Sequence, residues 1–297
     1  MSERNFREML EAQWDRGNFV CVGLDPEVKK LPEPLRLRYT ECSSTSPGTQ
    51  FLAFCERIVQ ATADLVCAYK LNLAFFERHG EQGWEALHRI ITRIHEIASD
   101  VPVIADAKRA DIGNTNAGYA DAIFGSLQAD AITVHPYLGA EALQPFLARA
   151  DKGIFILCRT SNPGADEFQD LLVRRDDHLP LPHLRPLVPL YQYLAQRVAT
   201  VWNKHGNCGV VVGATYPREL QAVRKIVGDM PILIPGIGTQ GGDVEKTVTA
   251  GIAGRASSST LRTASFSRQM GLTSQKRRDG KPSSSATLST CTDRKEI

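Results

Sequence analysis

The residues best suited to do chemistry are concentrated in the stretch Val101–Thr115, which reads VPVIADAKRADIGNT. The apolar run Val101–Ala105 predicts a buried strand, and Asp106 and Lys108 stand two residues apart at its end. Side chains at i and i+2 of a strand leave on the same face, so a carboxylate and an ammonium lie side by side. A second carboxylate, Asp111, follows in the loop. Placing three charges at the end of an apolar strand costs desolvation free energy that core packing alone would not require. This favours a functional site, and an ordinary strand-end ion pair is the alternative.

This strand belongs to a series of short apolar segments separated by segments with helical periodicity. We expect the other strands over Asn18–Asp25, Asp64–Asn72, Ala129–His135, Gly153–Cys158, Cys208–Ala214 and Pro231–Pro235. Short strands without polar alternation indicate a parallel sheet that is covered on both faces. Seven such strands with polar residues at their carboxyl ends predict an α/β fold, a (β/α)8 TIM-type barrel with its site at that rim. A doubly wound open sheet is the competing fold, with its site at the same strand ends.

The eighth strand and the closing helix of such a barrel are not recognisable in the sequence. After Thr247–Gly251 the chain is dominated by Ser, Thr, Lys and Arg up to Ile297. This composition buries too little apolar surface to offset the entropy of ordering the chain. We therefore expect a barrel domain over residues 1–251, a disordered basic tail over residues 252–297, and an eighth strand that is missing or replaced.

Composition and charge indicate a globular protein. The 297 residues are 42% apolar and carry a net charge of +2. The segment from Gly251 to the end holds nine basic and three acidic residues, a balance of +6, which leaves −4 for residues 1–250. The seven cysteines show no C-x-x-C spacing, and neither a signal peptide nor a membrane-spanning run is apparent. We expect a reduced, cytoplasmic protein without disulfides or a zinc site.

A glycine-rich stretch follows the seventh strand. Gly236–Gly241 formally matches G-x-G-x-x-G, but no acidic residue follows about 20 positions later, as a dinucleotide site would require. A phosphate held by the loop and the next helix N-terminus is the better interpretation, and a plain glycine turn is the alternative. Asp25 and Ser161 are interpreted as functional rather than as a strand-end cap and a turn hydroxyl, whereas His135 is assigned a packing or supporting role.

Taken together, these motifs resemble one family, orotidine 5'-phosphate decarboxylase in its longer bacterial form. The matching stretches, in chain order, are Gly23–Pro26 (GLDP), Tyr69–Glu77 (YKLNLAFFE), Asp106–Thr115 (DAKRADIGNT), Val134–Gly139 (VHPYLG), Arg159–Gly164 (RTSNPG), Val212–Thr215 (VGAT) and Pro235–Gly242 (PGIGTQGG). The resemblance covers roughly residues 5–251. It is specific because the motifs occur in family order at successive strand ends.

The resemblance implies a decarboxylation of orotidine 5'-phosphate to UMP without a cofactor, in a homodimer. Lys70, Asp106, Lys108 and Asp111 would form an alternating charged array. Lys108 would protonate C6 of the pyrimidine, and Lys70 would hold the array. The residues that reach the neighbouring subunit's site would be Asp111, Ile112 and Thr115. Those that bind substrate within one subunit would be Asp25 at the ribose, Ser161 at the pyrimidine, and Gly238 and Gln240 at the phosphate.

The array also has a direct physical rationale. Loss of CO2 from C6 leaves a carbanion that cannot delocalise into the ring π system, so the catalyst must supply fixed positive charge and a proton. A lysine ammonium supplies both, and flanking carboxylates keep it protonated. Two unit charges about 4 Å apart interact by only about 4 kcal/mol at an effective dielectric constant near 20. Because enzymatic rate accelerations need at least about 8 kcal/mol, phosphate binding energy must contribute as well.

The resemblance fails at the eighth strand, where the family carries an Ile-Asn-Ser-Ser-Arg-like motif whose arginine clamps the phosphate. Gly251–Thr260 does not supply this motif. We hypothesise a shifted reading frame, because permitted codons from Arg255 onward, read from their third base, encode Gly-Ile-Ile-Ile-Asn-Ser-Ser. That second frame has no arginine at the clamp position, since Thr263 constrains the bases there. Without the clamp and with open strand edges, we expect weak or no activity and poor solubility.

Two function classes compete with this interpretation. One is a magnesium-dependent sugar-phosphate decarboxylase or aldolase with the same D-x-K-x-x-D strand, which a magnesium requirement would support. The other is an inactive protein whose basic tail binds nucleic acid. The tail lacks interleaved aromatic residues and repeats, which argues against nucleic-acid binding.

Overall fold

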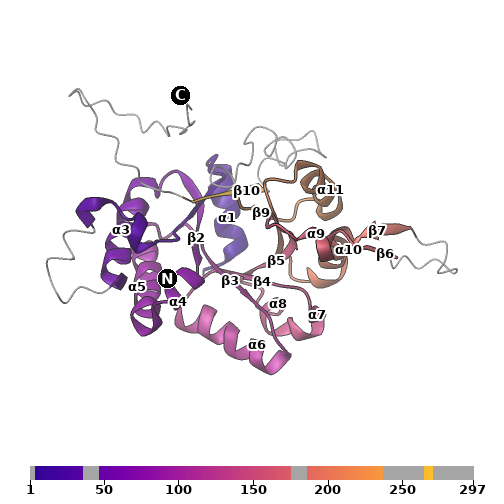
Figure 1. Ribbon diagram of the computed structural model, residues 1–297, viewed down its shortest axis with the longest axis horizontal. Helices are drawn as coiled ribbons and strands as arrows, with labels where there is room; N and C mark the ends of the chain where they lie inside the picture. Colours follow the sequence, from indigo (N-terminus) through magenta and orange to yellow (C-terminus); the bar gives the residue numbers. More distant parts are fainter. Residues whose placement is uncertain (1–3, 36–46, 175–185, 237–263, 270–297) are drawn as a thin grey trace.

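The computed structural model describes residues 4–35, 47–174, 186–236 and 264–269. Its main sheet is a closed barrel of parallel strands in the order β1-β10-β9-β8-β5-β4-β3-β2 (Figure 1). The strands are β1 (Val20–Gly23), β2 (Val66–Asn72), β3 (Val103–Arg109), β4 (Ala131–Val134), β5 (Gly153–Arg159), β8 (Cys208–Val212), β9 (Ile232–Ile234) and β10 (Ala264–Gln269). The prediction of a TIM-type barrel is confirmed, and the open doubly wound sheet is not found.

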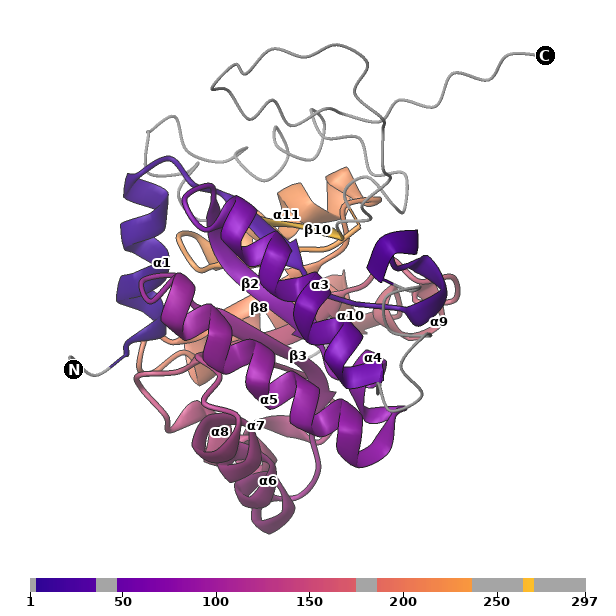
Figure 2. The same ribbon diagram turned by 90° about the vertical axis from the view of Figure 1, so that its left-hand side faces the viewer.

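Helices connect the strands and cover the outside of the barrel (Figures 1 and 2). They are α1 (Phe6–Asp15), η1 (Val28–Lys30), α3 (Pro47–Thr62), α4 (Ala74–Glu77), α5 (Gly80–Ile97), α6 (Gly113–Ala120), α7 (Gly139–Ala142), α8 (Gln144–Leu147), α9 (Asp166–Gln169), α10 (Leu190–Arg197) and α11 (Pro217–Val227), with π-helical turns η2 (Asp121–Ser126) and η4 (Val198–Trp202). Helix α10 is continued directly by the π-helical turn η4. No helix among the described residues is both long and apolar enough to cross a membrane.

Before their carboxyl-terminal ends, strands β1 to β5, β8 and β9 are mostly apolar because both of their faces are buried. Outward-facing side chains pack with the helices into one large core. Inward-facing side chains such as Cys67, Ile104 and Phe155 form a second cluster inside the barrel. Helix α1 closes the amino-terminal end of this inner cluster: Asn5 caps its first turn, and the ring of Phe6 meets that of Phe155 edge to face at 5.6 Å. The opposite, carboxyl-terminal rim is left for a site.

The eighth strand position is occupied by β10. Its residues pair in parallel with β1 on one side and with β9 on the other. This strand lies inside the segment that we expected to be a disordered tail, so for these six residues the structure differs from that expectation. The eighth strand is replaced rather than missing. The rest of 252–297 lies outside the described residues, and the domain boundary at 251 stays a prediction.

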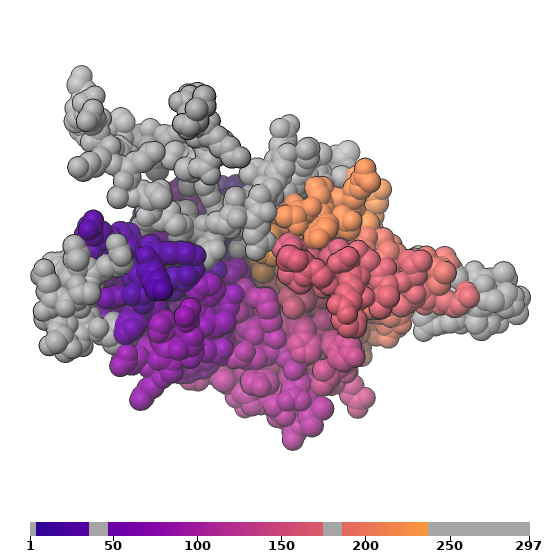
Figure 3. Space-filling view, in the orientation of Figure 1, coloured from indigo at the N-terminus to yellow at the C-terminus, as the bar shows by residue number. Residues whose placement is uncertain are grey.

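A separate two-stranded antiparallel sheet projects from the side of the barrel (Figures 1 and 3). It consists of β6 (Leu172–Arg174) and β7 (Leu187–Pro189). Leu172 and Leu187 on it are more than half exposed.

Candidate active site

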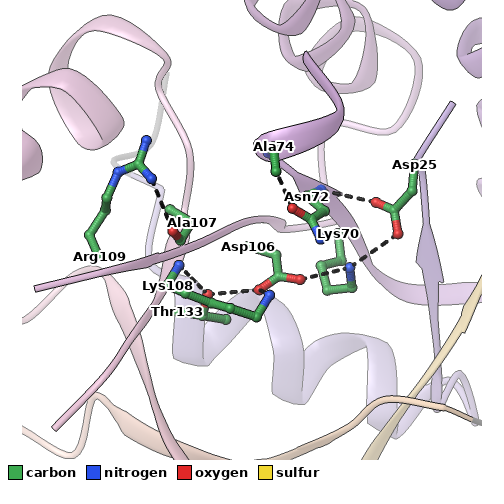
Figure 4. A network of polar contacts seen from close by, with 9 residues as sticks. All are labelled: Asp25, Lys70, Asn72, Ala74, Asp106, Ala107, Lys108, Arg109 and Thr133. Atoms are coloured by element: carbon green, nitrogen blue, oxygen red, sulfur yellow. Dashed lines mark hydrogen bonds and ion pairs between the residues drawn. The ribbon is translucent and has the colours of Figure 1, made fainter. Parts of the chain in front are cut away.

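The carboxylate of Asp106 is the centre of a charged array at the carboxyl-terminal rim (Figure 4). Its Oδ2 accepts a hydrogen bond from Nζ of Lys70 at 3.1 Å, and its Oδ1 accepts one from Nζ of Lys108 at 2.7 Å. The hydroxyl of Thr133 donates a third hydrogen bond to Oδ1 at 2.8 Å. Each oxygen of this buried carboxylate therefore has a cationic partner, which is the condition for keeping such a group ionised.

Asp25 extends the array on the other side of Lys70. Its Oδ2 lies 3.6 Å from Nζ of Lys70, and its Oδ1 accepts a hydrogen bond from the backbone N–H of Asn72 at 3.0 Å. The charges thus alternate in the order Asp25, Lys70, Asp106 and Lys108. Lys70 therefore pairs with both carboxylates, and Lys108 pairs with Asp106.

The barrel topology explains why these residues meet. Asp25 follows β1, Lys70 belongs to β2, Asp106 and Lys108 belong to β3, and Thr133 belongs to β4. These strands are neighbours in the sheet and run in the same direction, so their carboxyl ends share one edge. Residues two apart on β3 face the same way, as expected for Asp106 and Lys108. In contrast, Arg109 points away from the array (Figure 4), and its guanidinium forms an ion pair with Glu77.

Burial and charge act on these groups in opposite directions. Burial disfavours the carboxylate form of Asp106, but the ammonium groups of Lys70 and Lys108 outweigh it and hold its pKa well below the usual value. Burial likewise disfavours the charged form of Lys70, but Asp106 and Asp25 raise its pKa above the usual value. The pair is therefore ionised at neutral pH, and the site presents a fixed pattern of charges rather than a pair that shares a proton.

The array lines a cavity of about 590 Å³ at the rim. One side of the cavity is charged, and Leu157, Val211 and Leu233 form an apolar part of its wall. Ser161 and Gly236 lie on its border. The volume is sufficient for a ligand of nucleotide size, with a charged wall for one part and an apolar wall for a ring.

The predicted site residues fall into three groups. The structure brings Asp25, Lys70, Asp106, Lys108 and Ser161 together around this cavity. Those that do not line it are Asp111, Ile112 and Thr115, which lie in the loop and first turn of α6; the side chain of Asp111 accepts a hydrogen bond from the backbone N–H of Ile112. Gly238 and Gln240 lie outside the described residues.

Sequence reasoning missed several polar side chains of the site. Thr133, Asn72 and Gln169 line the cavity, and none of them was singled out. A signal existed for Thr133, because it is the one hydroxyl in the otherwise apolar strand β4. His135 lines a different cavity, beside α10, and its packing or supporting role stays a prediction. Within the described ranges, no group of three or more His, Cys, Asp and Glu side chains is arranged to hold a metal ion.

Comparison with known proteins adds an independent line of argument. Residues 18–261 match the model of the orotidine 5'-phosphate decarboxylase / HUMPS family. The chain is 48% identical over 247 residues to an orotidine 5'-phosphate decarboxylase of Ralstonia pickettii, covering 83% of each chain.

Among solved structures, the chain resembles the OMP decarboxylase of Leishmania donovani, with a TM-score of 0.71 and 34% identity, covering 89% of each chain. It also resembles the UMP synthase of that organism, with a TM-score of 0.74 and 35% identity. The match to the synthase covers 91% of this chain but only 52% of the synthase chain, so this chain spans about half the length of the synthase.

Proposed function

The chain belongs to the orotidine 5'-phosphate decarboxylase / HUMPS family, and we infer from the charged array how it converts orotidine 5'-phosphate to UMP. The enzyme is a carboxy-lyase of pyrimidine biosynthesis. The single observation that carries the mechanism is the alternation of Asp25, Lys70, Asp106 and Lys108 along one wall of the cavity.

In the proposed reaction the bond between C6 and the carboxylate carbon breaks, and its electron pair stays on C6 while CO2 leaves. The ammonium of Lys108 stabilises the developing negative charge and then donates a proton to C6, which forms the C6–H bond of UMP. Lys108 regains its proton from solvent. Its side chain suits this role, because it is 49% exposed towards the cavity opening while its partner Asp106 is only 11% exposed.

The carboxylate of Asp106 has two roles in this scheme. It fixes the Lys108 ammonium, and it lies close to where the substrate carboxylate must sit, so that repulsion favours loss of CO2. Lys70 holds Asp106 and Asp25 in place and is itself too buried to reach far into the cavity, with 6% of its side chain exposed.

We further propose that the active unit is a homodimer in which Asp111, Ile112 and Thr115 complete the neighbouring subunit's site. Two observations support this. None of the three residues lines the cavity of its own chain. The Ile112 side chain is 57% exposed, as expected for an apolar group that is covered in an assembly.

We propose the remaining substrate contacts from where these residues lie in the sequence or around the cavity. Asp25, at the end of β1, binds the ribose, and Ser161, on the cavity border, binds the pyrimidine edge. Gly238 and Gln240 bind the phosphate. Gly236, whose φ of 98° lies in the region that favours glycine, borders the cavity and stands two positions before Gly238 in the sequence.

The C-terminal segment is the subject of a separate proposal. The family match ends at residue 261, before β10 begins. We propose that the shifted frame removed the family's native eighth strand, so that activity is reduced relative to relatives. Sequencing the gene tests this, because codons that cannot encode the second frame would rule it out.

Residence in a reducing cytoplasm is also a proposal. Of the cysteines in the described ranges, Cys21, Cys55, Cys158 and Cys208 are buried free thiols, and Cys67 is buried as well. Burial raises the pKa of the Cys158 thiol to about 12, which makes it unreactive.

The direct test is turnover of orotidine 5'-phosphate by the purified chain, followed as formation of UMP. We expect weak UMP formation at most, and any that is measured should be lost in Lys108→Ala. An inactive chain whose activity returns when the second reading frame is restored, with arginine at the clamp position, would assign the defect to the C-terminus. No UMP formation by either chain would contradict the proposed mechanism.

A further inference from the structure

The pairing of β3 with β4 is interrupted where the array is built. Ala105 pairs with Ile132 and Arg109 pairs with Val134, so the three residues 106–108 of β3 face the single residue Thr133 of β4. Extra residues on one strand form a bulge, which leaves backbone groups without ladder partners and re-aims side chains. The residues in this bulge include both Asp106 and Lys108.

The Thr133 hydroxyl fills the gap that the bulge creates. Its Oγ1 accepts a hydrogen bond from the backbone N–H of Lys108 at 3.0 Å and donates one to Oδ1 of Asp106 at 2.8 Å. Thr133 is 1% exposed, so no solvent competes for these bonds. A single buried hydroxyl therefore links the backbone of one array member to the carboxylate of the other.

Lys108 adopts an unusual backbone conformation at this point. Its φ is 48°, in the left-handed region that side-chain-bearing residues rarely occupy. Such conformations persist only where surrounding bonds over-determine them, and they cluster at functional sites. Here the hydroxyl of Thr133 accepts a hydrogen bond from the backbone N–H of Lys108, and Nζ of Lys108 donates a hydrogen bond to Oδ1 of Asp106.

We propose that Thr133 is a positioning residue for the decarboxylation, one that fixes the left-handed turn at Lys108 and the rotamer of Asp106 and so aims the ammonium at the reacting carbon. Thr133 acts through the other two residues and supplies no proton itself. The expected effect on turnover rests on the proposed function. The expected effect on the geometry of Lys108 and Asp106 rests on the hydrogen bonds alone.

A merely structural role would also destabilise the protein on substitution, so the test must separate the two. Thr133→Val keeps the shape of the side chain and removes the hydroxyl, and Thr133→Ser keeps the hydroxyl. Thr62→Val is the matched control, because the Thr62 hydroxyl is also buried and makes two hydrogen bonds, to the carbonyl of Ile58 and with the hydroxyl of Tyr69.

The first measurement is the steady-state turnover of orotidine 5'-phosphate by the full chain. We expect kcat of Thr133→Val to fall roughly 10- to 100-fold, the size of effect that follows from a misplaced reacting group, with little change in KM. Thr133→Ser should recover most of kcat, and Thr62→Val should keep it. A kcat of Thr133→Val equal to that of wild type, or no recovery in Thr133→Ser, would overturn the proposal.

The second measurement does not depend on activity. Crystal structures of the wild type and both Thr133 variants report the φ of Lys108 and the distance from its Nζ to Asp106. We expect both to change in Thr133→Val and to be kept in Thr133→Ser. Unchanged geometry in Thr133→Val overturns the proposal, whatever the turnover. If the wild type does not form UMP at all, the proposed function fails and this second measurement alone decides the role of Thr133.

Discussion

The Nζ atom of Lys108 lies 2.7 Å from Oδ1 of Asp106, and the two side chains differ fourfold in exposure, at 49% and 11%. The carboxylate is fixed by three partners inside the barrel rim, whereas the ammonium is held at one end and faces the cavity. A fixed anion beside a reachable cation suits a proton donor, because the anion holds the ammonium in position at the cavity wall without occupying the substrate's place.

Replacement of Lys108 should separate catalysis from folding. We expect Lys108→Ala to lower kcat by roughly 10²- to 10⁴-fold, the usual contribution of a positioned acid. Stability should change by less than about 1 kcal/mol, because the side chain is half exposed and Lys70 still pairs with Asp106. Lys204→Ala, at an exposed position away from the cavity, is the control. Substantial turnover by Lys108→Ala would remove Lys108 from the role of acid.

Replacement of Lys70 should affect stability as well as activity. Lys70→Met leaves the buried carboxylates of Asp106 and Asp25 without their shared cation, which should cost about 3–5 kcal/mol in free energy of unfolding. Without Lys70 the pKa of Asp106 rises towards or above its ordinary value of 3.8, whereas in the wild type it stays well below, so the deficit relative to wild type should shrink as pH falls from 7 to 3. Urea denaturation at both pH values measures this. A deficit that does not depend on pH would argue against an ion-pair origin.

Asp130 should contribute to stability in a pH window of its own. Burial opposes its ionisation, but hydrogen bonds from Arg4, the contact with His95 and the N–H of Val103 outweigh it and lower its pKa from 3.8 to about 2. A lowered folded-state pKa contributes stability that is present above the unfolded value and is lost as pH falls through the folded value. The shift corresponds to about 2 kcal/mol, lost between pH 4 and pH 2.

Thermal unfolding of Asp130→Asn against wild type tests this. The variant should be less stable at pH 7 and approach wild type near pH 2. Asp121→Asn, at a carboxylate that is 75% exposed, should show no such convergence. Parallel pH profiles for Asp130→Asn and wild type would contradict the assignment.

Gly213 should matter for the position of Ser161. A Cβ at Gly213 would lie 2.6 Å from Cβ and 2.9 Å from the backbone N of Ser161, so Gly213→Ala must displace the Ser161 loop. We expect KM for orotidine 5'-phosphate to rise roughly tenfold, the effect of losing one polar contact of about 1.4 kcal/mol. Gly125→Ala, where nothing lies within 4 Å of the added Cβ, is the matched control. An unchanged KM would mean that Ser161 does not bind the substrate.

Mixing of two inactive variants should reveal a shared site. In a heterodimer of Lys108→Ala and Asp111→Ala subunits, one of the two sites receives both Lys108 and the partner subunit's Asp111. Random pairing makes half of the dimers mixed, so about one quarter of wild-type turnover should return. The measurement is turnover after the two variants are denatured and refolded together. No gain over the separately refolded variants would contradict donation of Asp111 across the interface.

The sequence by itself determined which strands form and which of their ends are charged. Unalternated apolar runs predicted seven strands of the barrel, because strands buried on both faces cannot carry polar alternation. Asp25, Lys70, Asp106 and Lys108 then had to gather at one rim, since parallel strands present their carboxyl ends at the same edge.

Only the tertiary structure decided how the array is held and how the barrel closes. The break in pairing that places Thr133 opposite residues 106–108 depends on the register of two strands, which no local pattern encodes. Asp111 stands outside its own cavity because the loop turns into α6. β10 forms despite its polar composition because β1 and β9 each offer an unpaired edge. The composition of a segment indicates how much apolar surface it can bury. It does not indicate whether two open strand edges will be available for backbone hydrogen bonds, because that depends on the surrounding fold.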